Sequence, residues 1–162
     1  MERLWSPWRF SYVSGIDQRP EGCVFCDAAA QPDAPLVVFR GVASYVILNL
    51  YPYTNGHLMV IPARHVASLA ATTAAERAEM MELTQLAERA LGEAYRPDGM
   101  NVGINLGRAG GAGIVDHLHM HVVPRWDGDT NFMTSVAESR VLPETLERSA
   151  EKLRPLFAKL AR

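Results

Sequence analysis

Short apolar or alternating runs occur along most of the chain, and they predict β-strands because successive side chains of a strand point to opposite faces. Glycine, proline and asparagine residues separate these runs, as they do in the turns between strands. The stretches that fit are Leu36–Phe39, Ser44–Leu50, His57–Pro62, Met100–Leu106 and Asp116–Val123. Because most of them follow one another directly, they predict an antiparallel sheet of about five strands.

A longer stretch between the third and fourth predicted strands has helical spacing, with apolar residues recurring every three or four positions. Thr73-Ala74-Ala75-Glu76 matches a capping box, so we expect a helix that begins there and runs to about Tyr95. A second helix is expected over Pro143–Leu160, and Pro155 is expected to kink or interrupt it. These elements together predict an α+β fold.

The composition is typical of a soluble globular protein, with 48% hydrophobic and 21% charged residues among 162, and it fits a single domain over residues 1–162. Residues 1–22 are expected to dock on this domain as an arm, because Trp5 and Trp8 can bury large areas. We expect a cytoplasmic protein without a membrane partner, because no apolar run approaches about 20 residues. A net charge of −2 argues against binding to a nucleic-acid polymer.

The most informative stretch is His117-Leu118-His119-Met120-His121-Val122-Val123, which Pro124 follows. In a strand the three histidines would share one face, whereas a helix would spread them over about 200° at ~100° per residue. Imidazole titrates near neutral pH, binds metals and can act as a nucleophile. Three histidines in this register predict a functional site, although a single histidine on an apolar face is more often a satisfied core residue.

This pattern resembles the defining motif of the histidine-triad (HIT) superfamily of nucleotidyl hydrolases and transferases. The stretch Asn49–His57, with Pro52 and Gly56, is similar to the segment Asn/Asp-x-x-Pro-x-x-x-Gly-His of that family. The likeness extends from Leu4 to about Leu160 and is closest to the branch that contains bacterial diadenosine tetraphosphate phosphorylases. It implies an antiparallel HIT sheet with one long internal helix and a C-terminal helix.

The resemblance assigns roles to individual residues. It implies that His119 is the nucleophile, that His121 and Asn105 stabilise charge on the phosphate, and that His57 supports the triad. For the substrate, it implies binding by Asn49 at the ribose, by Ile47 and Leu50 at the base, by Gly111 and Gly113 at the phosphates, and by Trp126 as a pocket wall. Many relatives have a serine where this chain has Gly113. An Asn/Gly/Pro loop and a flexible hairpin would have the same local compositions.

Cys23-Val24-Phe25-Cys26 is a second candidate site. A Cys-x2-Cys pair can be a redox pair, two incidental core cysteines or half of a zinc site. Some HIT proteins close such a site with a later Pro-x-x-His and the first triad histidine, which here are Pro62-Ala63-Arg64-His65 and His117. The resemblance therefore implies a structural zinc held by Cys23, Cys26, His65 and His117, and the alternative is a reduced cysteine pair under the N-terminal arm.

The favoured hypothesis is an enzyme that cleaves dinucleoside polyphosphates through a covalent nucleotidyl-histidine, which phosphate then resolves. By family analogy the substrate is an adenine nucleotide, the protein is a homodimer, and no organic cofactor is needed. Three alternatives stay open at this point. The chain could be a hydrolase of nucleoside phosphoramidates or dinucleotides, a metallohydrolase that binds its metal with all three histidines, or a nucleotide-binding interaction module.

Overall fold

The computed structural model describes residues 22–130 and 144–162, and within them one antiparallel sheet forms the centre of the fold. Its strands are β1 (Val37–Arg40), β2 (Ser44–Leu48), β3 (Leu58–Pro62), β4 (Gly99–Ile104) and β5 (Met120–Arg125). They are arranged in the order β1-β2-β3-β5-β4, and every neighbouring pair is antiparallel. The expected five-stranded antiparallel sheet is confirmed.

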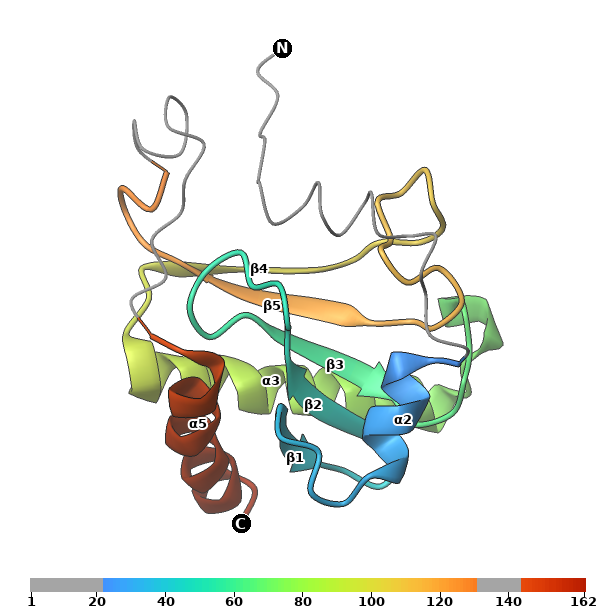
Figure 1. The fold of residues 1–162 in the computed structure, drawn as a ribbon, viewed down its shortest axis with the longest axis horizontal. Coiled ribbons are helices and arrows are strands. Elements are labelled where there is room, and N and C mark those ends of the chain that lie inside the picture. The colour runs from blue at the N-terminus through green and yellow to red at the C-terminus, as the bar shows by residue number, and fades with distance from the viewer. Residues whose placement is uncertain (1–21, 131–143) are drawn as a thin grey trace.

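The helices are α2 (Val24–Ala30), α3 (Ala74–Tyr95) and α5 (Leu146–Leu160), and a short 3-10 helix covers Leu69–Ala71. In Figure 1, α3 lies behind the sheet with α5 beside it, whereas α2 lies in front of the sheet. None of these described helices is long and apolar enough to cross a membrane.

The two faces of the sheet differ because side chains alternate along each strand. Val46, Val60 and Val122 point to the face that α3 covers, where they join the main apolar core. Ile47 and Met59 point to the opposite face, where they pack with Phe25 of α2 in a smaller apolar cluster. The histidines of the triad strand therefore come to lie on the α2 face.

The capping box predicted at the start of α3 is confirmed. Thr73 Oγ1 accepts a hydrogen bond from the Glu76 backbone N–H at 3.2 Å, and the Glu76 carboxylate accepts one from the Thr73 N–H at 2.7 Å. Helix α5 begins after Thr145, whose side chain caps it, and it continues through Pro155. The expected interruption at Pro155 is wrong, because Leu153 and Phe157 on either side of it are fully buried in the core.

The structure differs from the predicted elements at two places. Helix α2 was not predicted, although the three consecutive alanines 28–30 favour a helix. Strand β5 begins at Met120, so His117 and His119 precede the strand instead of lying within it. The reason is that β3 ends at Pro62, and the preceding segment bonds to the chain beyond it: the Leu118 N–H donates to the Val66 carbonyl at 2.6 Å.

The described part of the chain packs as one unit around this sheet. The expectation of a single domain over residues 1–162 stays a prediction, and so does the docking of the N-terminal arm, because residues 1–21 and 131–143 lie outside the described ranges.

Candidate functional site

The three triad histidines differ in what their ring nitrogens contact. His117 is fully buried, and its Nε2–H donates to the Pro62 carbonyl at 2.8 Å. A neutral imidazole that carries its proton on Nε2 has its lone pair on Nδ1. That Nδ1 lies 3.2 Å from Cys23 Sγ and 3.6 Å from Cys26 Sγ. Burial lowers the pKa of His117, which keeps the ring neutral and able to bind a metal.

The ring of His119 has the opposite tautomer. Its Nδ1 lies 2.8 Å from the backbone carbonyl of His117, which can only accept, so Nδ1 carries the proton and Nε2 carries the lone pair. Burial lowers the pKa of His119, although the bond to the carbonyl opposes this effect. His119 is therefore a neutral imidazole with an unprotonated Nε2, as a nucleophile requires.

A chain of hydrogen bonds links His57 to His121. The Tyr53 backbone N–H donates to His57 Nδ1 at 3.1 Å, so the proton of His57 is on Nε2. That Nε2–H donates to His121 Nδ1 at 2.9 Å, which leaves a proton on His121 Nε2. Burial, together with the repulsion that His121 and His119 exert when they are protonated, lowers the pKa of His57 to about 3. His57 is thus a fixed neutral donor, and His121 presents an N–H group to any anion beside it.

The rings of His119 and His121 lie close together, with centroids 5.0 Å apart in a T-shaped arrangement. One ring therefore offers a lone pair and the other a proton within a single small region. Phe25 packs against the other side of His119, with ring centroids 5.2 Å apart. The arrangement can attack an electrophile and stabilise negative charge on it at the same time.

The Cys-x2-Cys motif joins two histidines in a separate cluster. The ligand atoms of Cys23, Cys26, His65 and His117 all lie within 4.8 Å of one another, and Cys26 Sγ is 3.2 Å from His65 Nδ1. A tetrahedral zinc site with these donors has ligand separations of about 3.3–3.8 Å. Burial and the adjacent Cys23 raise the pKa of the Cys26 thiol. The donor set and its spacing fit a four-coordinate metal such as zinc, which would bind the thiolate form.

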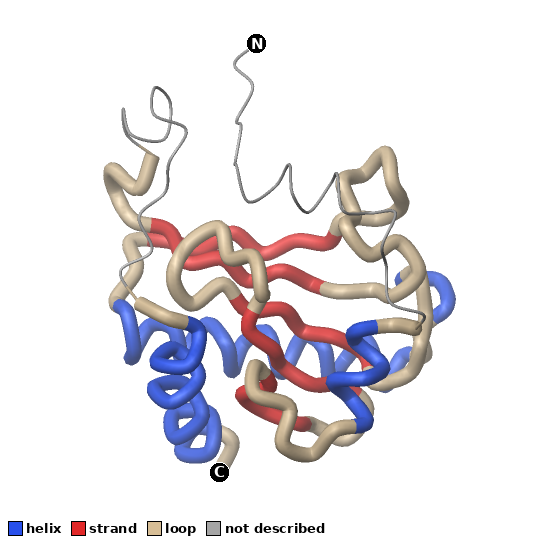
Figure 2. Tube along the Cα trace, in the orientation of Figure 1, coloured by secondary structure: helices blue, strands red, loops and turns tan. Residues whose placement is uncertain are grey.

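The glycine-rich segment forms the connection between β4 and β5, drawn as a long loop in Figure 2. Asn105 begins it, and its side-chain amide lies 3.5 Å from the Gly111 carbonyl. Gly111 has a positive φ of 88°, and a Cβ placed on Gly110 would lie 2.3 Å from the Leu106 carbonyl oxygen. Glycine is therefore required at both positions, and the backbone bends back on itself beside Asn105.

A groove of about 290 Å³ runs over β4 and β5 next to this loop, and it contains His121 and Asn105. Its remaining lining residues are Tyr53, Asn101, Val102, Gly103, Val123 and Arg125. The Arg125 guanidinium donates to both Asp129 carboxylate oxygens, at 2.6 and 2.7 Å, and to Asn101 Oδ1 at 2.9 Å. These bonds hold one end of the groove in place, and those to Asp129 raise the pKa of Arg125.

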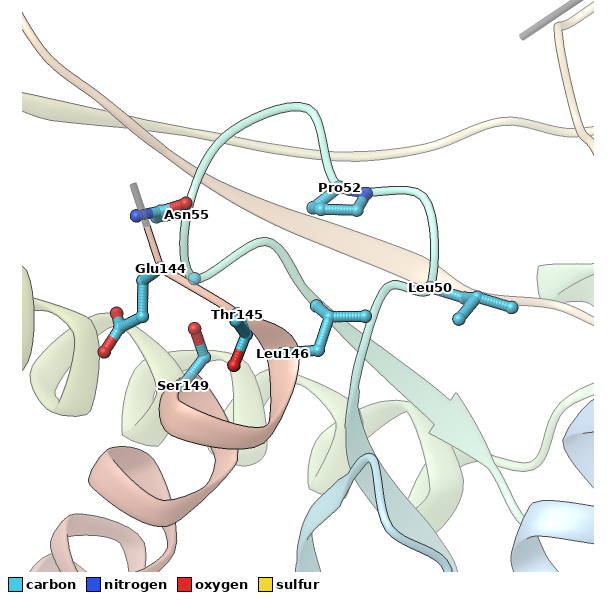
Figure 3. Close-up of a pocket in the computed structure, with 8 residues that line it drawn as sticks. Leu50, Pro52, Asn55, Glu144, Thr145, Leu146 and Ser149 are labelled. Atoms are coloured by element: carbon cyan, nitrogen blue, oxygen red, sulfur yellow. The ribbon is translucent and has the colours of Figure 1, made fainter. Parts of the chain in front are cut away.

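A second hollow, of about 230 Å³, lies between the loop after β2 and the start of α5 (Figure 3). Leu50, Asn55, Thr145 and Ser149 are among its lining residues, and no histidine lines it. The nearby carboxylate of Glu144 is paired with Lys152 at 2.8 Å. Because no histidine lines it, this hollow lacks the imidazole groups that lie beside the groove at His121.

The structure brings together most of the residues expected at the site. Ile47 lies in the apolar cluster with Phe25. The Asn49 amide is 3.3 Å from His57 Nδ1, while its oxygen accepts from the Tyr51 N–H. Leu50 is 57% exposed and lines the second hollow, whereas Ile47 does not line it.

Trp126 and Gly113, the last two residues expected to contact the substrate, do not line either hollow. Trp126 follows the end of β5. Gly113 is half-buried in the loop before the triad.

Sequence reasoning missed Phe25, Gly103, Asn101 and Arg125. The sequence does contain a pattern that could have identified some of these residues. Along β4 and one residue beyond its end, Asn101, Gly103 and Asn105 alternate with Met100, Val102 and Ile104, and within the strand this places Asn101 and Gly103 on the face of the triad. No comparable local pattern identifies Phe25, because its partner His119 is distant in sequence.

Comparison with known proteins gives a consistent result. A family model described as the HIT domain matches residues 33–128, which is more than half of the chain. An AP-4-A phosphorylase of Mycobacterium tuberculosis is 40% identical over 171 residues, covering 98% of this chain and 86% of that protein. A bis(5'-adenosyl)-triphosphatase of Saccharomyces cerevisiae is 33% identical over 91 residues, covering 56% of this chain and 44% of that protein.

Among solved structures, a Zn-bound histidine triad family protein of Mycobacterium smegmatis superposes with a TM-score of 0.71 and 34% identity. The match covers 86% of this chain and 96% of that one. The triad, the sheet that carries it and these matches agree with the expected relationship. The chain belongs to the HIT domain family.

Proposed function

We propose that this chain cleaves dinucleoside polyphosphates, such as diadenosine tetraphosphate, through a covalent nucleotidyl-histidine on His119, and that inorganic phosphate is the second acceptor. The observation that carries the proposal is the bond from His119 Nδ1–H to the His117 carbonyl at 2.8 Å, which leaves the Nε2 lone pair available. The chain is a HIT-family enzyme, as expected, given its identity of 40% over almost its whole length with a phosphorylase.

A row of cross-strand neighbours supports the placement of the substrate. Ile47 pairs with Met59, Met59 with His121, and His121 with Gly103. Two apolar residues, Ile47 and Met59, thus lie at one end of the row, and His121 lies next to them. Gly103 lies at the other end, where it has no side chain to fill the groove. The retained nucleoside lies over Ile47 and Met59 near Asn49, its α-phosphate lies at the triad, and the leaving polyphosphate lies in the groove.

The reaction then proceeds in two displacements. His119 Nε2 attacks the α-phosphorus, the bond from that phosphorus to the bridging oxygen breaks, and the nucleoside polyphosphate leaves as an anion whose newly charged oxygen accepts a hydrogen bond from His121 Nε2–H. Asn105 and the amides around Gly111 stabilise the phosphoryl oxygens. A phosphate oxygen next attacks the same phosphorus, the phosphorus–nitrogen bond breaks, and ADP leaves with His119 neutral again.

We also propose that Cys23, Cys26, His65 and His117 hold a structural zinc ion. The support is the spacing of the four ligand atoms, within 4.8 Å, and the Zn-bound relative from Mycobacterium smegmatis. Such a closed site supplies folding energy and no catalytic step. It also argues against a metallohydrolase that uses the whole triad. In the described residues the ligand-competent group contains His117 but neither His119 nor His121.

The proposal also includes the base of the substrate and the oligomeric state of the enzyme. The substrate is an adenine nucleotide, by analogy with the two relatives named for adenosine compounds. A homodimer is proposed in which the backbone edge of β4 forms the interface, because β4 is an edge strand of the described sheet. A cytoplasmic location stays a prediction.

Product analysis on diadenosine tetraphosphate, with and without inorganic phosphate, tests the proposal. The expected result is ATP plus ADP that form only when phosphate is present, and no products from His119→Ala with an unchanged circular dichroism spectrum. ATP plus AMP without phosphate would make the chain a hydrolase instead. Turnover by His119→Ala would contradict the covalent mechanism, and no turnover by the native chain would favour a nucleotide-binding module.

A further inference from the structure

We propose that metal binding at the Cys/His cluster and the positioning of His119 are coupled through helix α2, with Phe25 as a positioning residue. The inference rests on the proposed function for its effect on turnover, but the coupling itself is a property of the folded chain. It assigns a regulatory consequence to a metal that takes no part in the chemistry.

Helix α2 depends on its tertiary contacts. It has seven residues, and isolated helices shorter than about 12 residues are marginal in water. Its carbonyl groups are held by two side chains from the sheet. Tyr45 Oη donates to the Phe25 carbonyl at 2.6 Å, and Arg40 donates to the Ala28 and Ala29 carbonyls at 2.9 and 3.0 Å.

The N-terminal end of α2 is held differently. Cys23 is the N-cap residue, but its side chain makes no capping bond to the helix. Instead its thiol faces His117, and the thiol of Cys26 faces His65 and His117. A bound metal would replace these weak thiol contacts by coordinate bonds, so metal binding would fix this end of the helix.

Two routes lead from this end of the helix to His119. The first is His117, whose Nδ1 faces the thiols while its own carbonyl accepts the Nδ1–H of His119 at 2.8 Å. The second is Phe25, which lies between the two cysteines and is 5% exposed. Its ring centroid is 5.5 Å from that of His117 and 5.2 Å from that of His119. A shift of α2 therefore moves both groups that orient the imidazole of His119.

Coupling of this kind is reciprocal. If the metal favours the orientation of His119 that binds a nucleotide, a bound nucleotide must raise the affinity for the metal by the same factor. We expect a factor of about ten, within the usual range for coupled sites. Replacing Phe25 removes one of the two routes, so the factor should fall even though all four ligands remain.

The experiment uses the full chain in two steps. Histidine ring 15N NMR first compares the zinc-loaded and zinc-free protein without any nucleotide. We expect the Nδ1–H of His119 to exchange with solvent about tenfold more slowly when zinc is bound. Zinc affinity is then measured by competition with a chelator, with and without saturating AMP, for the native chain, Phe25→Ala and Val24→Ala. Val24 is 47% exposed on the same helix and serves as the matched control.

The native chain and Val24→Ala should bind zinc about tenfold more tightly with AMP. Phe25→Ala should bind one zinc per chain with a clearly smaller factor, because only the route through His117 remains, and with a lower kcat. If this variant fails to fold, Phe25→Leu, which keeps the apolar volume, should show an intermediate factor. Unchanged His119 exchange on zinc loading would overturn the coupling. Full coupling in Phe25→Ala would overturn the role of Phe25. Failure of AMP to bind would instead contradict the proposed function, while the zinc effect on His119 would stand.

Discussion

The two sides of the triad differ in how deeply they are buried and in the groups that surround them. On the α2 side, His117 is fully buried, and every nitrogen of its ring faces a carbonyl or a thiol. On the β4 side, Asn101, Val102 and Gly103 are exposed, and a glycine-rich loop borders the groove. His119 lies at the boundary between them. The comparison indicates that the closed side fixes the orientation of the nucleophile, whereas the open side leaves space for a large leaving group.

The largest expected effect concerns stability. Removing the metal from the Cys/His cluster should lower the free energy of unfolding. At a zinc concentration about a thousandfold above its dissociation constant, the site adds about 4 kcal/mol to the free energy of unfolding. Urea unfolding with zinc and with excess chelator should show this difference. The variant Cys26→Ser should have the same stability under both conditions. An equal stability of the native chain with zinc and with chelator would show that the cluster holds no structural metal.

On the open side, Gly110→Ala should have the largest effect. Its Cβ would lie 2.3 Å from the Leu106 carbonyl oxygen, so the loop backbone must move away from Asn105. A displacement of about 1 Å at a catalytic site can reduce the rate about 100-fold, and we expect such a loss in kcat/KM. Gly99→Ala is the matched control, because Gly99 starts β4 outside the lining of the groove and no atom of the described residues beyond its chain neighbours lies within 4 Å of a Cβ built there. Equal activities of the two variants would contradict a role for the loop geometry.

A larger side chain at Gly103 tests the groove directly. Gly103→Val adds volume next to His121 without a positive φ to strain it. If the leaving polyphosphate occupies the groove, KM for diadenosine tetraphosphate should rise about tenfold, which is about 1.4 kcal/mol, while AMP binds as before. Steady-state kinetics and calorimetry measure the two quantities. A parallel loss of AMP affinity would place the retained nucleotide, and not the leaving group, in the groove.

The pH dependence of stability tests whether His57 is buried as a neutral ring. Its pKa falls from 6.5 to about 3 on folding, so below pH 6.5 the unfolded chain takes up a proton that the folded chain does not. This contribution to stability is complete above pH 6.5 and is lost as the pH falls toward 3. The free energy of unfolding should decrease by about 1.4 kcal/mol per pH unit from this group. His57→Asn should reduce the slope by one proton in urea titrations, and an unchanged slope would contradict the burial of a neutral ring.

The sequence alone predicts the sheet, the capping box of α3 and the triad, because each depends on local periodicity or on a motif. It fails where distant segments meet. Cys26 lies 91 residues from His117, so the cluster followed from family resemblance and not from spacing. The early start expected for β5 has the same cause: Leu118 bonds to Val66 beyond the end of β3. The place of Leu50 at the second hollow could not be read from the sequence either, because residues of α5, distant along the chain, complete that hollow, and its expected role at the base stays a prediction.

Trapping the covalent intermediate is the most direct test of the central claim that His119 Nε2 is the nucleophile. The native chain is mixed with diadenosine tetraphosphate in phosphate-free buffer, quenched within one turnover and digested at a pH that preserves phosphoramidates. Mass spectrometry should find one adenylyl group on the peptide that contains His117, His119 and His121. Fragmentation should assign it to His119, and added phosphate should release it as ADP. An adduct on His121 would contradict the account. Turnover that shows no burst phase and leaves no adduct on the protein would contradict it as well.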